Sequence, residues 1–278
     1  MNKIISSLKR SIELLKEHKP LVLLSASADM LFLFVYGFVF SMVFSRIEGY
    51  LLELYNLMME SPQKMQNTLL NNGLLSALRA TPEMSAVFGK AVTWFLVLGA
   101  IIYVLYSIFQ GISWRISYRI MGKKIAYSRF IVKFALVNLL WFVFYIIYQV
   151  IDYLFDLNAM IAVNMDLGQS TSAGLSFIAF MVWVSMFVIG YFALISYTLI
   201  GRYNFFGVIK KSFGFGFRRL KVLLPAYLII LAVFFTINQF LILIFRINPM
   251  VMFALGIVTV FPAMTWARVF FNIAMNNE

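Results

Sequence analysis

The sequence contains no cysteine and only one histidine, His18. Without cysteine the chain forms no disulfide, and it supplies no thiolate nucleophile and no Cys-ligated zinc or iron–sulfur site. A single histidine excludes multi-histidine metal sites and disfavours any nucleophilic triad that depends on histidine. Nor is a nucleophile beside a base recognisable elsewhere. The sequence therefore predicts a non-enzymatic protein with no cofactor and no metal.

Charged residues are also scarce. They make up 12% of the 278 residues, whereas 63% are hydrophobic. Too few polar side chains remain to cover a water-soluble fold, so lipid must cover much of the surface. The net charge of +12 would suggest a nucleic-acid partner in a soluble chain. Here the basic residues gather in short segments between apolar runs, so we expect the lipid bilayer and no nucleic acid as their partner.

Six apolar runs are long enough to cross a bilayer. The first, Leu21 to Ser45, has about 25 residues and would span the ~30 Å hydrocarbon core as a helix. Residues 1–19 precede it and predict an interfacial helix with an apolar face made of Ile4, Leu8, Ile12 and Leu15. The sequence predicts an all-α, polytopic membrane protein, organised as a single membrane domain over residues 1–278. Its spans are expected at about 21–45, 86–114, 134–155, 175–200, 222–245 and 250–275.

The basic residues predict the orientation of the chain, because short cytoplasmic loops are enriched in Lys and Arg. With the N-terminus inside, all but five of the 23 Lys and Arg fall on the inner side. They lie before Pro20, in segments 115–133 and 202–221, and at Arg268. Acidic residues show the opposite bias. We therefore expect a multi-pass protein of the cell membrane with both termini in the cytoplasm.

The inner segments are similar to one another. LKRSIEL from Leu8 matches IKKSFGF from Ile209 in its charged, serine and apolar positions, and GKKIAYS from Gly122 is a fainter third copy. This similarity predicts three helical hairpins, each opened by a basic interfacial helix. The basic inner loops common to membrane proteins would explain it equally well.

This layout resembles that of prokaryotic six-helix membrane proteins related to the membrane domain attached to some glycerophosphodiester phosphodiesterases. The resemblance covers most of the chain and rests on the order of spans and basic segments. It implies a membrane module, expected in a prokaryotic plasma membrane, and no phosphodiesterase activity, because the catalytic domain and its metal-binding acids are not in this sequence.

Asp29 and Arg268 are the most deeply placed charges of each sign. Asp29 lies ~12 Å into the first span and Arg268 ~10 Å into the last, at the usual helical rise. An unpaired charge at such depth is costly, so we predict that the two form an intramembrane ion pair. Two alternatives are that Asp29 is a protonatable transport residue and that Arg268 extends to the headgroups. Other polar residues within the spans are expected to hydrogen-bond neighbouring helices: Gln110, Asn138, Gln149, Asn238 and Gln239.

A second group of candidate residues surrounds the heptapeptide KSFGFGF from Lys211. The aromatic residues would enter the acyl boundary, while the basic residues contact anionic lipid headgroups. These predicted lipid-headgroup contacts are Lys210, Lys211, Arg218, Arg219 and Lys221. The alternative is that these charges only set the orientation of the chain.

Two functions remain open. The low number of polar residues in the spans favours a non-enzymatic membrane module or accessory subunit of a transport or lipid-associated assembly, in which other membrane proteins are partners. The alternative is a small-solute transporter or permease with a polar site near Asp29. A water-accessible cavity reaching Asp29 would favour transport, and closed helix packing would favour the module.

Overall fold

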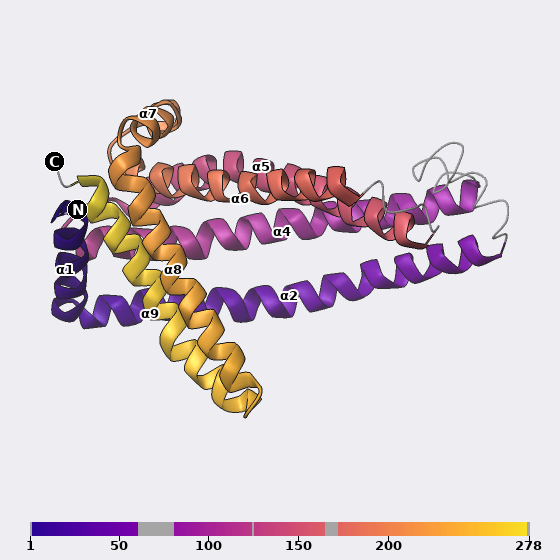
Figure 1. Ribbon diagram of the computed structural model, residues 1–278, viewed down its shortest axis with the longest axis horizontal. Helices are drawn as coiled ribbons and strands as arrows, with labels where there is room; N and C mark the ends of the chain where they lie inside the picture. Colours follow the sequence, from indigo (N-terminus) through magenta and orange to yellow (C-terminus); the bar gives the residue numbers. More distant parts are fainter. Residues whose placement is uncertain (1, 61–80, 124, 165–171, 277–278) are drawn as a thin grey trace. The chain divides into compact units, whose positions relative to one another are not determined.

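The computed structural model describes residues 2–60, 81–123, 125–164 and 172–276 (Figure 1). All regular secondary structure in these ranges is α-helical. The helices are α1 (Asn2–Glu17), α2 (Lys19–Met59), α4 (Pro82–Ile120), α5 (Tyr127–Asn164), α6 (Ser172–Leu199), α7 (Phe205–Arg218), α8 (Leu220–Phe245) and α9 (Pro249–Asn276).

Six of these helices are long and apolar enough to cross a membrane: α2, α4, α5, α6, α8 and α9. They include all six predicted spans, so the predicted fold class, an all-α multi-pass membrane protein, is confirmed. α1 and α7 are shorter, with 16 and 14 residues, and each directly precedes a spanning helix.

The spanning helices are longer than the apolar runs predicted. α2 continues to Met59 with 41 residues, so residues 46–59, which follow the first predicted span, are helical. A helix of that length rises about 60 Å, roughly twice the hydrocarbon core. Arg46 and Glu48 mark the end of the apolar run, yet they do not end the helix, because Arg and Glu are good helix formers in water. Most of the stretch between the first and second predicted spans, residues 61–80, lies outside the described residues.

His18 separates α1 from α2. Its backbone N–H donates to the Leu14 carbonyl at 3.0 Å, and its own carbonyl accepts from the Leu21 N–H at 2.9 Å. Pro20 lacks an N–H and fits the first turn of α2. N–H groups in a first turn have no acceptor within the helix, so a proline loses no hydrogen bond there. The segment predicted as interfacial therefore folds as a helix of its own.

The third copy of the basic pattern, at Gly122, does not open a helix. Gly122 has a φ of 73°, its N–H bonds to the Arg119 carbonyl at 2.9 Å, and the Lys123 N–H bonds to the Tyr118 carbonyl at 3.0 Å. These two bonds form a Schellman motif, which ends α4. The predicted third interfacial helix is thus replaced by a helix stop, and α5 begins only at Tyr127.

By their contacts the described residues divide into two compact units. The first unit contains residues 1–30 and 107–278, and the second contains residues 31–106. The second unit is a pair of helices, formed by the remaining parts of α2 and α4. Its core has two clusters, one around Val43, Ile47 and Leu98 and the other around Leu54, Met84 and Val87.

The core of the first unit lies at one end of its helices. Its largest fully buried side chains come from the C-terminal parts of α4 and α9, from the end of α6 and the residue after it, and from the N-terminal parts of α5 and α8: Tyr118, Ile120, Phe130, Phe134, Val137, Ile195, Leu199, Ile200, Leu223, Phe270 and Phe271. Residues 231–260, by contrast, contain no buried side chain. In Figure 1 this part of the α8–α9 hairpin extends away from α5 and α6.

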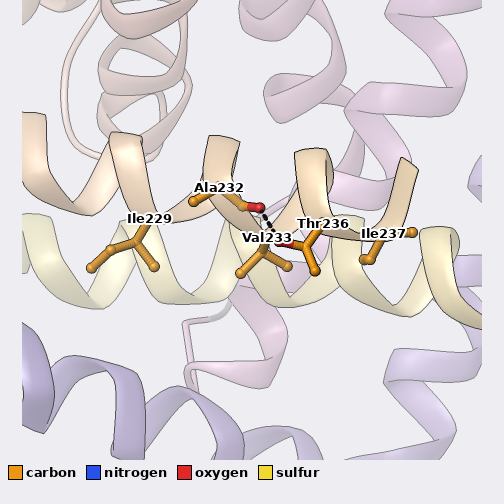
Figure 2. A pocket seen from close by; sticks show the side chains of 5 residues that line it. All are labelled: Ile229, Ala232, Val233, Thr236 and Ile237. Carbon is orange, nitrogen blue, oxygen red and sulfur yellow. Dashed lines mark hydrogen bonds between the residues drawn. The ribbon is translucent and has the colours of Figure 1, made fainter. Parts of the chain in front are cut away.

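The exposed surface of α8 is apolar and carries a hollow of about 320 Å³. Its lining comes from α8 alone: Ile229, Ala232, Val233, Thr236 and Ile237 (Figure 2). The Thr236 hydroxyl donates to the Ala232 carbonyl at 2.9 Å, so its polar group is satisfied inside the helix. The hollow therefore presents hydrocarbon to its surroundings, as a lipid-facing surface does.

Candidate functional site

Three helices of the first unit each bring two polar residues to one buried site, which we call the Asp29 network. α2 supplies Ser25 and Asp29, α4 supplies Gln110 and Ser113, and α9 supplies Thr265 and Arg268. In each pair the residues are three or four positions apart, so they share one face of their helix. The network thus joins segments separated by up to about 240 residues of chain, as the Ser25 to Thr265 bond shows.

Asp29 and Arg268 meet in a bidentate ion pair. Arg268 Nη1 donates to Asp29 Oδ2 at 2.7 Å, and Nη2 donates to Asp29 Oδ1 at 2.8 Å. The planar guanidinium matches the two carboxylate oxygens, which makes this the strongest geometry for such a pair. The structure therefore brings together the two residues that the sequence predicts as partners.

Gln110 completes the ion pair on one side. Its Oε1 accepts from Arg268 Nη2 at 2.7 Å, while its Nε2 donates to Asp29 Oδ1 at 3.1 Å. The amide thus presents its acceptor to the cation and its donor to the anion. Ser113 adds a further donor, with its hydroxyl 2.9 Å from Asp29 Oδ1.

Ser25 completes the other side. Its hydroxyl oxygen accepts from Thr265 Oγ1 at 3.0 Å and lies 3.4 Å from Arg268 Nη1. Asp29 Oδ1 therefore has three donors, and both Arg268 Nη atoms have acceptors. Buried charges are tolerated when such hydrogen bonds accompany the ion pair.

The network is closed to solvent. Asp29 is 1% exposed and Arg268 5%, and Ser25, Ser113 and Thr265 are fully buried. An enclosed ion pair with its hydrogen bonds made fixes the relative position of three helices, but it leaves Asp29 Oδ1 saturated and unable to accept a further ligand. Chemically, the site is suited to holding helices together.

The five predicted lipid-headgroup residues lie on or next to α7, and they do not share one environment. Lys210, Lys211, Arg218 and Lys221 are exposed. Arg219 is partly buried, donates from Nη1 to the Met275 carbonyl at 2.9 Å and lies over the Phe215 ring at 5.1 Å. Its side chain therefore binds the C-terminal end of α9, where unpaired carbonyls and the helix dipole favour a cation.

α1 and α7 each have a buried serine on the face that packs against the rest of the first unit. Ser11 and Ser212, the serines of the two similar heptapeptides, are both fully buried. Each hydroxyl bonds to the carbonyl three residues before it, at 2.7 and 2.8 Å. Ser11 also accepts a hydrogen bond from the Trp266 indole at 3.1 Å, which ties α1 to α9. The shared serine thus marks the packing face of each helix, whereas Ile12, predicted on the apolar face, is 41% exposed.

A second polar group, which links α4, α5 and α6, confirms the expected role of Asn138. Its Nδ2 donates to the Ser107 hydroxyl at 3.0 Å, and its Oδ1 accepts from the Tyr197 hydroxyl at 2.8 Å. The other predicted amides differ, since Gln149 bonds to Tyr145 on its own helix and both Asn238 and Gln239 are exposed.

Sequence reasoning missed the three hydroxyl residues of the Asp29 network. Ser25, Ser113 and Thr265 are individually unremarkable in a membrane helix, where a hydroxyl can bond to its own backbone. A usable signal was present nevertheless. Each lies three or four residues from Asp29, Gln110 or Arg268, on the same helical face.

Comparisons of the chain with models of protein families, with curated proteins and with solved structures find no match. Among the described residues, no group of three or more His, Asp or Glu side chains gathers to hold a metal ion.

Proposed function

We propose that this chain is a non-enzymatic membrane module, an accessory subunit of a transport or lipid-associated assembly. In this proposal the Asp29 network holds α2, α4 and α9 in a fixed arrangement. The observation that carries the proposal is that the deepest charges in the first unit are paired, hydrogen-bonded and closed to solvent. A module of this kind needs a fixed helix arrangement, an orientation and a surface for partners.

Transport is the alternative function. A substrate site would gather polar groups around a cavity that water reaches, commonly where spanning helices are broken. Pro225 and Pro262 lie within α8 and α9, yet both helices are continuous around them. Since Asp29 Oδ1 already has three donors, transport would require the ion pair to separate in another conformation. The closed geometry favours the module.

We further propose that both termini lie in the cytoplasm of a prokaryotic cell, at the plasma membrane. Six spans return the chain to the side on which it began, and α1 packs against α9 near the C-terminal end. Figure 1 shows the start of α1 and the end of α9 close together in the first unit. That end also carries Lys123, Lys133 and Arg202, as expected for an inner surface. α1 and α7 would lie there in the interface, with the exposed lysines and arginines of α7 at anionic headgroups.

Single-cysteine labelling tests closure and orientation together, because the natural chain has no cysteine. The three variants are Ser25→Cys in the buried network, Lys211→Cys on the exposed face of α7, and Gln66→Cys. Gln66 lies between the first and second predicted spans, a stretch that is outside the cell if the N-terminus is inside. An impermeant, hydrophilic thiol reagent is applied to intact cells, to permeabilised membranes and to protein denatured in SDS. Denaturation is the control that the thiol at position 25 can react.

We expect Gln66→Cys to react in intact cells and Lys211→Cys only after permeabilisation. Ser25→Cys should react only after denaturation, because residue 25 is fully buried. Reaction of Ser25→Cys in native membranes would favour the transporter and contradict the module. Reaction of Lys211→Cys in intact cells would invert the orientation.

A further inference from the structure

Two buried nitrogen donors near the basic end of the first unit have no hydrogen-bond partner. They are Lys123 Nζ and Asn272 Nδ2, and the Trp141 indole is the one other such donor among the described residues. Asn272 is fully buried. An unmet donor in a dry interior costs about 1 to 3 kcal/mol, and more if it is charged. A protein retains two such donors at low cost only if something else accepts their hydrogen bonds.

Tyr118 places these donors in one neighbourhood. Lys123 Nζ lies over the Tyr118 ring, 5.4 Å from its centroid. The Asn272 amide lies near the Tyr118 hydroxyl but makes no hydrogen bond of good geometry with it. That hydroxyl already donates to the Tyr197 carbonyl at 3.0 Å. The last turns of α4 and α9 thus bring both donors to the same aromatic ring.

The charge in this neighbourhood is positive. Burial lowers the pKa of Lys123, and the nearby Arg202 guanidinium lowers it further. Among the described residues neither cation forms an ion pair with an acid; Arg202 instead bonds to the Asn276 amide oxygen, one turn after Asn272. Nearby carbonyls at the ends of the helices are taken by other cations, Met275 by Arg219 and Tyr203 by Lys133.

We propose that Lys123, Asn272 and Arg202 form a binding site for a phosphate group. A fully ionised phosphate presents acceptor oxygens and no donor, so it complements an ammonium, an amide N–H and a guanidinium with no competing acid. Arg202 is exposed and is held at its tip by Asn276 alone, so its side chain can swing aside to admit the anion and then bind it.

This site differs from the exposed basic residues of α7. Those would attract anionic lipid by summed charge, which salt screens. A site with buried donors binds a single group with defined geometry. The phosphate can belong to an anionic lipid headgroup in the adjacent leaflet or to a free, soluble phosphate, and the experiment separates these two sources.

The test measures the melting temperature of the full chain, purified in an uncharged detergent free of phosphate. Inorganic phosphate is titrated in one arm, and mixed micelles containing phosphatidylglycerol replace it in the other. Chloride at equal ionic strength and diacylglycerol, a lipid without a phosphate, are the respective blanks. The variants are Lys123→Gln and Asn272→Asp. Lys211→Gln is the matched control, since it removes the same charge from an exposed surface.

We expect saturable stabilisation of the natural chain and of Lys211→Gln in at least one arm. A response in the phosphate arm indicates a soluble ligand, and a response only to phosphatidylglycerol indicates a headgroup. Lys123→Gln should bind about tenfold or more weakly, the effect of losing a hydrogen bond to a charged group. Asn272→Asp should melt higher without ligand and lose the response, because its carboxylate supplies the missing anion.

Absence of saturable stabilisation in both arms would overturn the proposal. So would equal weakening by Lys211→Gln and Lys123→Gln, because binding would then follow net charge alone. If Asn272→Asp keeps the full response, the phosphate does not lie at Asn272 and the site as described is wrong.

Discussion

The Asp29 network and the Lys123 neighbourhood both hold buried polar groups of the first unit, and they differ in how many partners those groups have. In the network, Asp29 Oδ1 has three donors, and both Arg268 Nη atoms have acceptors. Near Lys123, two donors have no acceptor at all. A complete set of bonds fixes structure and leaves nothing for a ligand. An incomplete set costs stability until a ligand supplies the missing group.

The largest effect is expected from breaking the complete set. Arg268→Gln removes one partner of a buried ion pair and leaves the Asp29 carboxylate uncompensated, which should cost about 3 to 5 kcal/mol. The measurement is the melting temperature in detergent, with Arg218→Gln as control because Arg218 is exposed on α7. A melting temperature as high as that of the control would show that the network does not hold the fold.

A smaller effect is expected at Gln110. Gln110→Leu keeps the ion pair but removes one acceptor from Arg268 and one donor from Asp29, so it should cost about 1 to 3 kcal/mol. Gln149→Leu is the matched control, because Gln149 is exposed and bonds only to Tyr145 on its own helix. It should change stability by no more than about 0.5 kcal/mol. Equal losses in both variants would mean that Gln110 contributes no more than a surface amide.

The sequence predicted the fold class and the Asp29 to Arg268 contact because both follow from local composition. Long apolar runs predict spanning helices. One deep acid and one deep base, with matching depths, then leave few ways to avoid an unpaired charge. Gln110 was recognised as a polar residue within a span, but its position between the two charges depends on how α4 is rotated, which its own sequence does not fix.

The helix ends were harder to predict, because an apolar run shows where the chain crosses the membrane and does not show where the helix begins or ends. α2 passes through Arg46 and Glu48 without interruption. Conversely, the basic pattern at Gly122 resembles the pattern within α7, but its glycine has a positive φ and stops α4. The unpaired donors near Lys123 could not be predicted from sequence either, since they depend on which carbonyls other cations already occupy.

A double-mutant cycle on Asp29 and Arg268 tests most directly whether their ion pair stabilises the packing of the helices. Melting temperatures are compared for the natural chain, Asp29→Asn, Arg268→Gln and the double variant in one detergent. Each single variant leaves a buried charge without its partner, whereas the double variant removes both charges. We predict that the double variant loses clearly less than the sum of the single losses, with a coupling of about 0.5 to 3 kcal/mol. Additive losses would contradict the account, because the two charges would then stabilise the fold independently.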